Sequence, residues 1–132
     1  MLERRFRVRA APSPTGYMHI GNLRTYIYDY FLAKQNSGDC LLRIEDTDKS
    51  RFVEGAVENL CNSLKQLGIE PNEGVWIDDD NKIFQRGDHG PYIQSERKHI
   101  HQQYAKQLVE MGKAYYCFCT AERLDEVRKM QE

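Results

Sequence analysis

A rigid turn and a single histidine stand together near the start of the chain, in the sequence APSPTGYMHIGN. Its prolines fix φ and stiffen the backbone. Gly16 and Gly21 have no side chain, so a ligand can come close to the backbone at these positions. His19 can form a hydrogen bond to a phosphate or to a leaving group. This combination favours a phosphate-binding turn, with an ordinary surface turn and an exposed histidine as the alternative.

The elements on either side of this turn would position it at a sheet edge. In RFRVRAA, three arginines alternate with Phe6, Val8 and Ala10, which predicts a strand with one buried face. Apolar residues then recur at helical spacing over Leu23–Gln35, and Gly38 is expected to be the left-handed residue that ends this helix. Parallel sheets bind ligands at the carboxyl ends of their strands, and helix N-termini favour phosphate. The turn is therefore the expected binding site.

The rest of the chain continues the alternation of strands and helices. A glycine or a capping residue marks most of the boundaries. The expected elements are a strand over 40–46, a helix capped by Ser50 and ended by Gly68, a loop over 69–92 with one short strand at 75–77, a third helix ended by Gly112, a strand over 114–119 and a fourth helix capped by Thr120. This order predicts an α/β fold of parallel strands with crossover helices. A doubly wound sheet usually has five or six strands, so we expect the chain to be the front part of something longer.

Composition narrows the class of protein. The 132 residues carry 19 Lys and Arg against 20 Asp and Glu, a net charge of −1, so contact with nucleic acid must come from local basic patches. No apolar run approaches the length of a membrane span, and the N-terminus has no apolar signal core. Four cysteines are too few for a secreted disulfide scaffold, and Cys40 and Cys61 are expected in the core. We expect a cytoplasmic monomer that does not bind membranes.

Two longer motifs resemble those of a known family. APSPTGYMHIGN followed by LRIEDTDKSR looks like the class I aminoacyl-tRNA synthetases, and within them the glutamyl-tRNA synthetases. HIGN corresponds to the class signature HIGH, with Asn22 in place of the last histidine. The segments HGPYIQSER and AYYCFCTAERL also resemble sequences of this family, so the resemblance spans the whole chain. It implies the first half of a Rossmann-like nucleotide-binding domain over residues 1–92, and a third helix and the start of the inserted, acceptor-stem-binding region over 93–132.

The resemblance implies an amino-acid site at the same sheet edge. By this resemblance Arg9, Ala11 and Ser13 bind the glutamate substrate, and Glu45 holds its ammonium group. An arginine at a strand end can grip a carboxylate through two hydrogen bonds. The alternative is that Arg9 is a solvated charge like the other strand arginines, and that Glu45 belongs to a solvated acidic loop.

The implied reaction is activation of glutamate by ATP followed by transfer to tRNA(Glu). Such a reaction depends on positioning and charge stabilisation, so His19 would be the catalytic residue that stabilises charge on the phosphate. Mg²⁺ would bridge phosphate oxygens. The residues that the resemblance assigns to ATP are Pro12, Thr15, Gly16, His19, Gly21 and Asn22. Arg51 and Arg97 are candidates for contact with tRNA phosphates, or ordinary surface charges.

Cys117 and Cys119 are spaced as half of a tetrahedral zinc site. Some relatives complete such a site with ligands further downstream, but nothing with suitable spacing follows Cys119 here. The alternative is a pair of reduced cysteines.

Three functional interpretations stay open. The first is the amino-terminal part of a glutamyl-tRNA synthetase, inactive alone because the family's lysine-rich ATP loop and anticodon-binding region are absent. The second is a tRNA-modifying relative that attaches glutamate to the modified base queuosine. The third is a non-catalytic nucleotide-binding module. A small nucleotidyltransferase sharing the histidine signature fits less well, because of the acidic motif.

Overall fold

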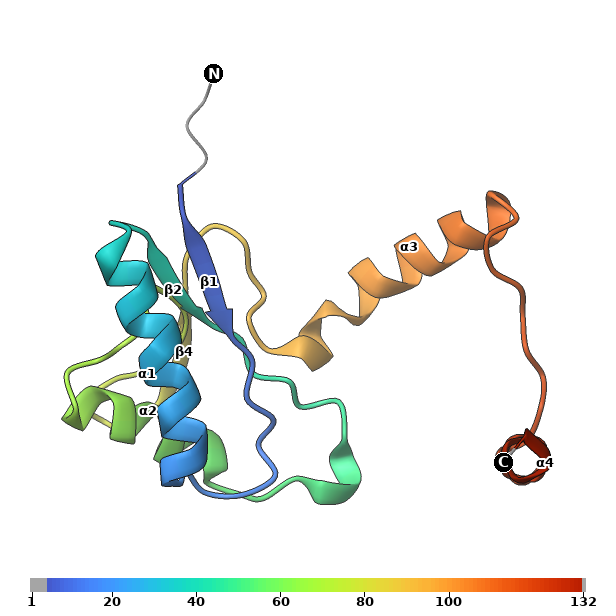
Figure 1. Cartoon of the computed structure of the whole chain (residues 1–132), viewed down its shortest axis with the longest axis horizontal. Helices are drawn as coiled ribbons and strands as arrows, with labels where there is room; N and C mark the ends of the chain where they lie inside the picture. The colour runs from blue at the N-terminus through green and yellow to red at the C-terminus, as the bar shows by residue number, and fades with distance from the viewer. Residues whose placement is uncertain (1–4, 132) are drawn as a thin grey trace. The chain divides into compact units, whose positions relative to one another are not determined.

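Four strands form one mixed sheet in the order β1-β2-β3-β4. Figure 1 shows the first two, β1 and β2, side by side. The structure, a computed structural model, describes residues 5–131. The strands are β1 (Arg7–Ala10), β2 (Asp39–Leu42), β3 (Glu73–Ile77) and β4 (Ile83–Arg86). β1, β2 and β3 are parallel, and β4 pairs with β3 in the antiparallel sense. The predicted α/β fold with parallel strands is therefore confirmed, with one antiparallel strand added.

Helices connect the parallel strands and form most of the chain after them. They are α1 (Ile20–Gln35), α2 (Ala56–Gln66), α3 (Lys98–Glu110) and α4 (Ala121–Gln131), with short 3₁₀ helices η1 (Lys49–Arg51) and η2 (Gln94–Arg97). The chain divides into two compact units, the first ending at Lys98 and the second beginning at His99. No helix within residues 5–131 is both long enough and apolar enough to cross a bilayer.

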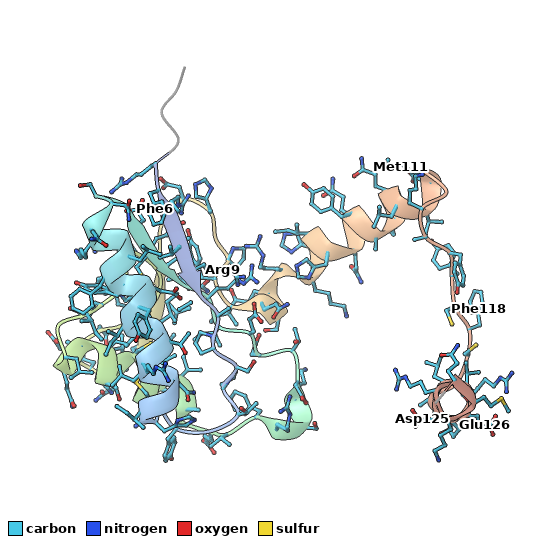
Figure 2. The ribbon with its side chains drawn as sticks, viewed as in Figure 1. Phe6, Arg9, Met111, Phe118, Asp125 and Glu126 are labelled. Carbon is cyan, nitrogen blue, oxygen red and sulfur yellow. The ribbon has the colours of Figure 1, made fainter. Side chains whose placement is uncertain are left out.

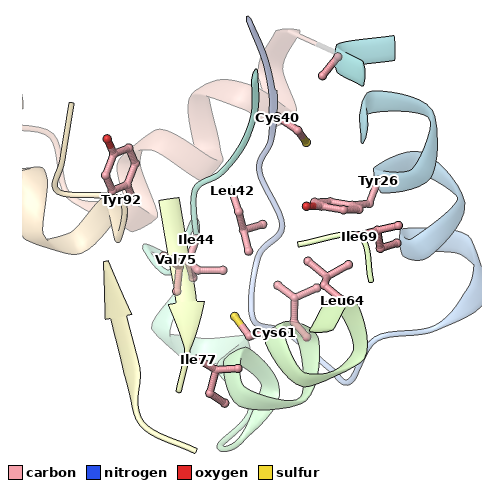
Figure 3. Packing of buried hydrophobic residues seen from close by; sticks show 12 residues of the cluster. Tyr26, Cys40, Leu42, Ile44, Cys61, Leu64, Ile69, Val75, Ile77 and Tyr92 are labelled. Atoms are coloured by element: carbon pink, nitrogen blue, oxygen red, sulfur yellow. The ribbon is translucent and has the colours of Figure 1, made fainter. Parts of the chain in front are cut away.

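The hydrophobic core lies in the first unit, where α1 and α2 pack against the sheet. Leu42 of β2 and Val75 of β3 are fully buried, and they meet Tyr26 of α1 and Leu64 of α2 (Figure 3). Each such aliphatic side chain contributes about 1.5–3 kcal/mol through burial. Cys40 and Cys61 belong to the same cluster, as expected. This core fixes the positions of the strand ends that carry the site.

Gly74 allows the backbone of β3 to lie close to that of β2. Its φ is 128°, a conformation that residues with a Cβ rarely adopt, and a Cβ there would lie 2.1 Å from the carbonyl oxygen of Leu42. Val75 and Ile77 are buried in the core, whereas Glu73 is only half-buried and bonds to Tyr92 and Arg7.

Three local predictions were wrong. Phe6 is exposed and lies one residue before β1, although its carbonyl accepts a hydrogen bond from the Asp39 N–H at 2.9 Å. The left-handed residue after α1 is Ser37, with φ 49°. Gly38 serves a close contact instead: a Cβ there would lie 2.3 Å from the carbonyl oxygen of Phe6. Ser50 does not cap α2, which begins after Gly55; the Ser50 N–H bonds to Asp48 at the start of η1.

Two strand predictions were also wrong. The segment 69–92 holds two strands, because β4 folds back on β3 to form a hairpin. Residues 114–119 form no strand, and Tyr115, Tyr116 and Phe118 are exposed. A strand needs a neighbour for its backbone hydrogen bonds, and no strand is assigned from His99 to Gln131. In contrast, Thr120 caps α4 as expected, and its Oγ1 accepts a hydrogen bond from the Arg123 N–H at 3.3 Å.

Candidate functional site

The turn between β1 and α1 is held from both sides by backbone hydrogen bonds. The Glu45 N–H donates to the Pro12 carbonyl at 2.9 Å, and the Val53 N–H donates to the Pro14 carbonyl at 2.9 Å. Within the turn, the Thr15 N–H donates to the Ser13 carbonyl at 2.8 Å. Stiff prolines and three backbone anchors make this a fixed turn, which is what a preformed binding site requires.

A cavity of about 270 Å³ opens beside the turn, between the end of β1 and the inner side of α1. Four of the predicted site residues line it: Arg9, Ala11, Pro12 and Asn22. Ser13 and Gly16 line a much smaller adjoining hollow of about 10 Å³, together with Pro12 and Asn22. The structure thus gathers most of the predicted substrate and ATP residues around one turn.

The inner side of α1 adds lining residues that the sequence analysis did not select. Thr25, Tyr26 and Asp29 face the same cavity. Tyr26 is buried, and its hydroxyl has no hydrogen-bond partner within residues 5–131. Only the helical spacing of these residues from Asn22 could have indicated them, because residues three and four apart share a helix face.

His19 caps the first turn of α1. Its Nδ1 accepts a hydrogen bond from the Gly21 N–H at 3.1 Å, which satisfies one of the amide groups that a helix start leaves free. A Cβ at Gly21 would lie 2.9 Å from Cε1 of His19, so any other residue there would force the ring to shift from its capping position. A Cβ at Gly16 would meet nothing within 4 Å, so no described packing contact requires that glycine. A glycine at position 16 would still allow a ligand to come close to the backbone.

Glu45 lies between two arginines. Its Oε1 accepts a hydrogen bond from Nη1 of Arg9 at 3.0 Å and another from Nη2 of Arg43 at 2.7 Å. The Arg43 hydrogen bond, followed by that of Arg9, holds the pKa of the Glu45 carboxyl below its usual value. Figure 2 shows Arg9 on β1. Arg43 was not among the predicted residues, although its spacing of two from Glu45 on an extended segment places both on one face.

The segment after Tyr92 supports the other side of residues 44–46. Ile44 forms a parallel bridge with Ile93, and the Ile44 N–H donates to the Tyr92 carbonyl at 2.9 Å. Asp46 accepts hydrogen bonds from the N–H and the hydroxyl of Ser95, at 2.8 and 2.6 Å. Glu45 is therefore set in a backbone that is bonded on both flanks.

The two candidate tRNA contacts differ in how free their guanidinium groups are. Arg51 is exposed and pairs with Asp48 at 2.7 Å. Arg97 is half-buried and donates to the Pro91 carbonyl at 2.8 Å and the His89 carbonyl at 3.3 Å. Arg51 is thus the more accessible cation, whereas Arg97 is engaged in holding the loop before η2.

Cys117 and Cys119 are exposed, in the extended segment between α3 and α4. The hydrogen bond that the Cys119 thiol makes to the neighbouring Cys117 raises the pKa of Cys119. Over residues 5–131, no group of three or more His, Cys, Asp or Glu side chains is arranged to hold a metal ion. The two thiols therefore stay half of a possible site.

Burial separates the four cysteines into two reactivity classes. Cys117 and Cys119 should react at once with a thiol reagent, whereas Cys40 and Cys61 should react only on unfolding. Burial raises the pKa of Cys61 to about 12, so the reactive thiolate is scarce at neutral pH. Timed labelling with mass spectrometry checks this. Rapid labelling of Cys40 or Cys61 in the folded chain would contradict the described core.

A strand, a stiff turn and a histidine-capped helix meet at the carboxyl edge of parallel strands, which is where open α/β sheets bind their ligands. Residues 5–132 match the family described as tRNA synthetases class I (E and Q), catalytic domain, and the chain belongs to this family. The resemblance inferred from the sequence motifs is confirmed.

Individual relatives agree with the family. The chain is 60% identical to the glutamate–tRNA ligase of Clostridioides difficile over 125 residues, which cover 95% of this chain and 25% of that protein. It is 56% identical to that of Finegoldia magna, covering 96% and 26%. A crystal structure of a glutamate tRNA ligase from Elizabethkingia meningosepticum, in complex with its amino acid, matches with a TM-score of 0.76 and 42% identity, covering 96% and 24%. The chain therefore spans about a quarter of the length of these relatives.

Proposed function

We propose that this chain forms the amino-terminal part of a glutamate–tRNA ligase, which activates glutamate with ATP and transfers it to tRNA(Glu). The observation that carries the proposal is the Arg9–Glu45 pair, at 3.0 Å, beside the turn that His19 follows. An α-amino acid carries a carboxylate and an ammonium on one carbon. A guanidinium and a carboxylate side by side are complementary to both groups. Membership of the family supports the same assignment.

Glutamate would enter by exchange of ion pairs. Its carboxylate would take the place of Glu45 on Arg9, and its ammonium would become the new partner of Glu45, at the carboxylate oxygen that Arg43 does not bind. Ala11 and Ser13, in the turn after Arg9, would contact the same ligand. Because Arg9 and Glu45 are paired before glutamate arrives, neither charge lacks a partner in the free protein.

ATP would bind along the turn and the start of α1. Pro12, Thr15, Gly16, Gly21 and Asn22 would form its cradle. The open space at Gly16 supports close approach of the nucleotide to the backbone there. The helix start favours the phosphates.

His19 would stabilise the charge that develops when the glutamate carboxylate attacks the α-phosphate and pyrophosphate leaves. Because Nδ1 accepts the Gly21 N–H, a neutral ring carries its proton on Nε2. That N–H is then free to donate to a phosphate oxygen.

Mg²⁺ supplies charge neutralisation on the phosphate oxygens when it is bound with ATP. The acidic residues within residues 5–131 include no cluster of metal ligands, so we assign the ion to the phosphates rather than to a protein cage. Zinc at Cys117 and Cys119 would need ligands from elsewhere.

The tRNA and domain assignments extend the proposal. Arg51 is the favoured phosphate contact, since it is exposed, and Arg97 is the weaker candidate because carbonyl groups already engage it. Residues 1–92 would be the first half of the Rossmann-like catalytic domain. Residues 93–132 would begin the inserted region that binds the acceptor stem. We propose a cytoplasmic monomer.

The test is ATP–pyrophosphate exchange with the full-length ligase and with the 132-residue chain. Exchange by the full-length protein should require glutamate and tRNA(Glu), and the 132-residue chain should show none. The chain spans only a quarter of the ligases, so much of their catalytic machinery lies outside it. As a control, exchange is also measured with glutamine in place of glutamate, because the family includes synthetases for both amino acids.

Three outcomes would count against parts of this proposal. Clear turnover by the 132-residue chain would contradict its dependence on the rest of the protein. The full-length protein could instead fail to charge an unmodified tRNA(Glu) transcript and incorporate glutamate into base-modified tRNA. That result would favour the tRNA-modifying relative. Binding of ATP by the full-length protein without any exchange would favour the non-catalytic module.

A further inference from the structure

We propose that Arg43 is a positioning residue for Glu45: it holds one carboxylate oxygen so that the other faces the ammonium group of the substrate. This rests on the proposed function, because it assigns to Glu45 the binding of that ammonium. Arg43 lies within the motif LRIEDTDKSR, but the sequence analysis gave it no role, and the proposed role follows from its contacts.

The backbone places Arg43 and Glu45 together. The Arg43 N–H donates to the Ala10 carbonyl at 3.0 Å, and the Glu45 N–H donates to the Pro12 carbonyl at 2.9 Å. These bonds continue the parallel pairing of β1 with β2, in which Arg9 lies opposite Leu41. Side chains two apart on an extended segment share a face. Arg43 and Glu45 therefore share the face of Arg9, and the backbone of β1 sets their spacing.

The two arginines bind the same oxygen of Glu45. Nη2 of Arg43 and Nη1 of Arg9 both donate to Oε1, at 2.7 and 3.0 Å. Oε2 accepts no hydrogen bond within the described part of the chain. An ionised carboxylate can accept on both oxygens. The arrangement thus leaves one oxygen of Glu45 available for an N–H donor of a ligand.

Arg43 and Arg9 differ in their freedom to move. The Arg43 side chain is 26% exposed and that of Arg9 is 41% exposed. Nε of Arg43 is buried and has no partner among the described residues, so its guanidinium is enclosed on one side. Arg9 instead lines the 270 Å³ cavity. When a substrate carboxylate takes Arg9, Arg43 is the cation that stays on Glu45 and keeps it in place.

The experiment compares variants of the full-length ligase in glutamate-dependent ATP–pyrophosphate exchange. Arg43→Gln should raise KM for glutamate about 10-fold, because a charge-assisted hydrogen bond that orients Glu45 is lost. KM for ATP should change less than about 2-fold, since Glu45 does not contact the nucleotide in the proposed arrangement. Arg43→Lys should recover most of the loss, because the observed contact is a single hydrogen bond from a cation.

Arg7→Gln is the matched control. Arg7 lies on β1, two residues before Arg9, and also pairs with a carboxylate, but its partner is Glu73, and neither residue lines the cavity. This variant should leave both KM values unchanged. Thermal unfolding of each variant separates loss of folding from loss of positioning.

The outcomes distinguish the two proposals. If the wild type is active and Arg43→Gln leaves the KM for glutamate unchanged, the positioning role alone is overturned. An equal rise in both KM values, or an equal effect of Arg7→Gln, would overturn it too, since either indicates a general structural change. A wild type without glutamate-dependent exchange would overturn the proposed function, and the role of Arg43 with it.

Discussion

Replacing His19 with alanine is expected to lower kcat for glutamate-dependent ATP–pyrophosphate exchange by about 10²–10³-fold in the full-length ligase. That is the typical cost of removing one preorganised donor to a developing oxyanion. The geometry explains the size of the effect. Nδ1 is occupied by the Gly21 N–H, which orients the ring and leaves Nε2 as its free donor. The loss should fall mainly on kcat, because the donated hydrogen bond strengthens as charge develops.

His19 also has a structural role, and His19→Asn separates the two roles. Alanine removes the cap of α1 and should lower the free energy of unfolding by about 1 kcal/mol. Asparagine is a good N-cap and should retain most of that stability, but it lacks the Nε2 donor. Both variants should lose the same catalytic factor, as measured by exchange kinetics beside denaturant unfolding. An asparagine variant with wild-type kcat would show that His19 only caps the helix.

Gly74→Ala is expected to lower the free energy of unfolding by at least about 3 kcal/mol, at the upper end of single substitutions. Two costs add at this position. The φ of 128° is a region that residues with a Cβ rarely adopt. A Cβ would also lie 2.1 Å from the carbonyl oxygen and 2.7 Å from the amide nitrogen of Leu42. Because the contact is with backbone of the central strand β2, no rotamer change can relieve it.

Gly68→Ala is the matched control for Gly74→Ala. Gly68 has a φ of 65°, but a Cβ there would meet nothing within 4 Å. This variant bears only the backbone strain, about 1 kcal/mol. Denaturant unfolding of both variants measures the difference. A Gly74→Ala variant within 1 kcal/mol of wild type, or equal to Gly68→Ala, would contradict the described packing of β3 on β2.

The turn around His19 could be predicted from sequence because its determinants are local. Proline fixes φ within one residue, and apolar spacing after Leu23 identifies the helix within a few turns. The ends of the helices were harder to predict. Ser50 is a good capping residue by type, yet Asp48 and Ser50 form the short helix η1, and α2 begins only after Gly55. Several residues near 50 could cap a helix. Which of them does so depends on the backbone between them and Val53, whose N–H bonds to the Pro14 carbonyl.

Strand pairing depended on contacts that no local pattern contains. The apolar and aromatic run at 114–119 has the pattern of a strand, but no strand is assigned beside it over residues 99–131. The segment 83–86 has a weaker pattern, and it becomes β4 because the turn after β3 returns it to an available edge. Backbone hydrogen bonds must be satisfied in pairs, so the presence of a partner outweighs the propensity of the segment.

The sequence by itself determined the stiff turn before His19, the α/β order of elements and membership of the synthetase family. Each of these depends on residue types at short spacings along the chain. Only the tertiary structure decided that Arg43 joins Arg9 on one oxygen of Glu45, that Ser95 bonds to Asp46, and that Arg97 is engaged by carbonyl groups. The reason is physical: an ion pair forms where the fold brings two side chains within a few ångströms, and residues 9 and 45 meet because β1 and β2 pair in one register.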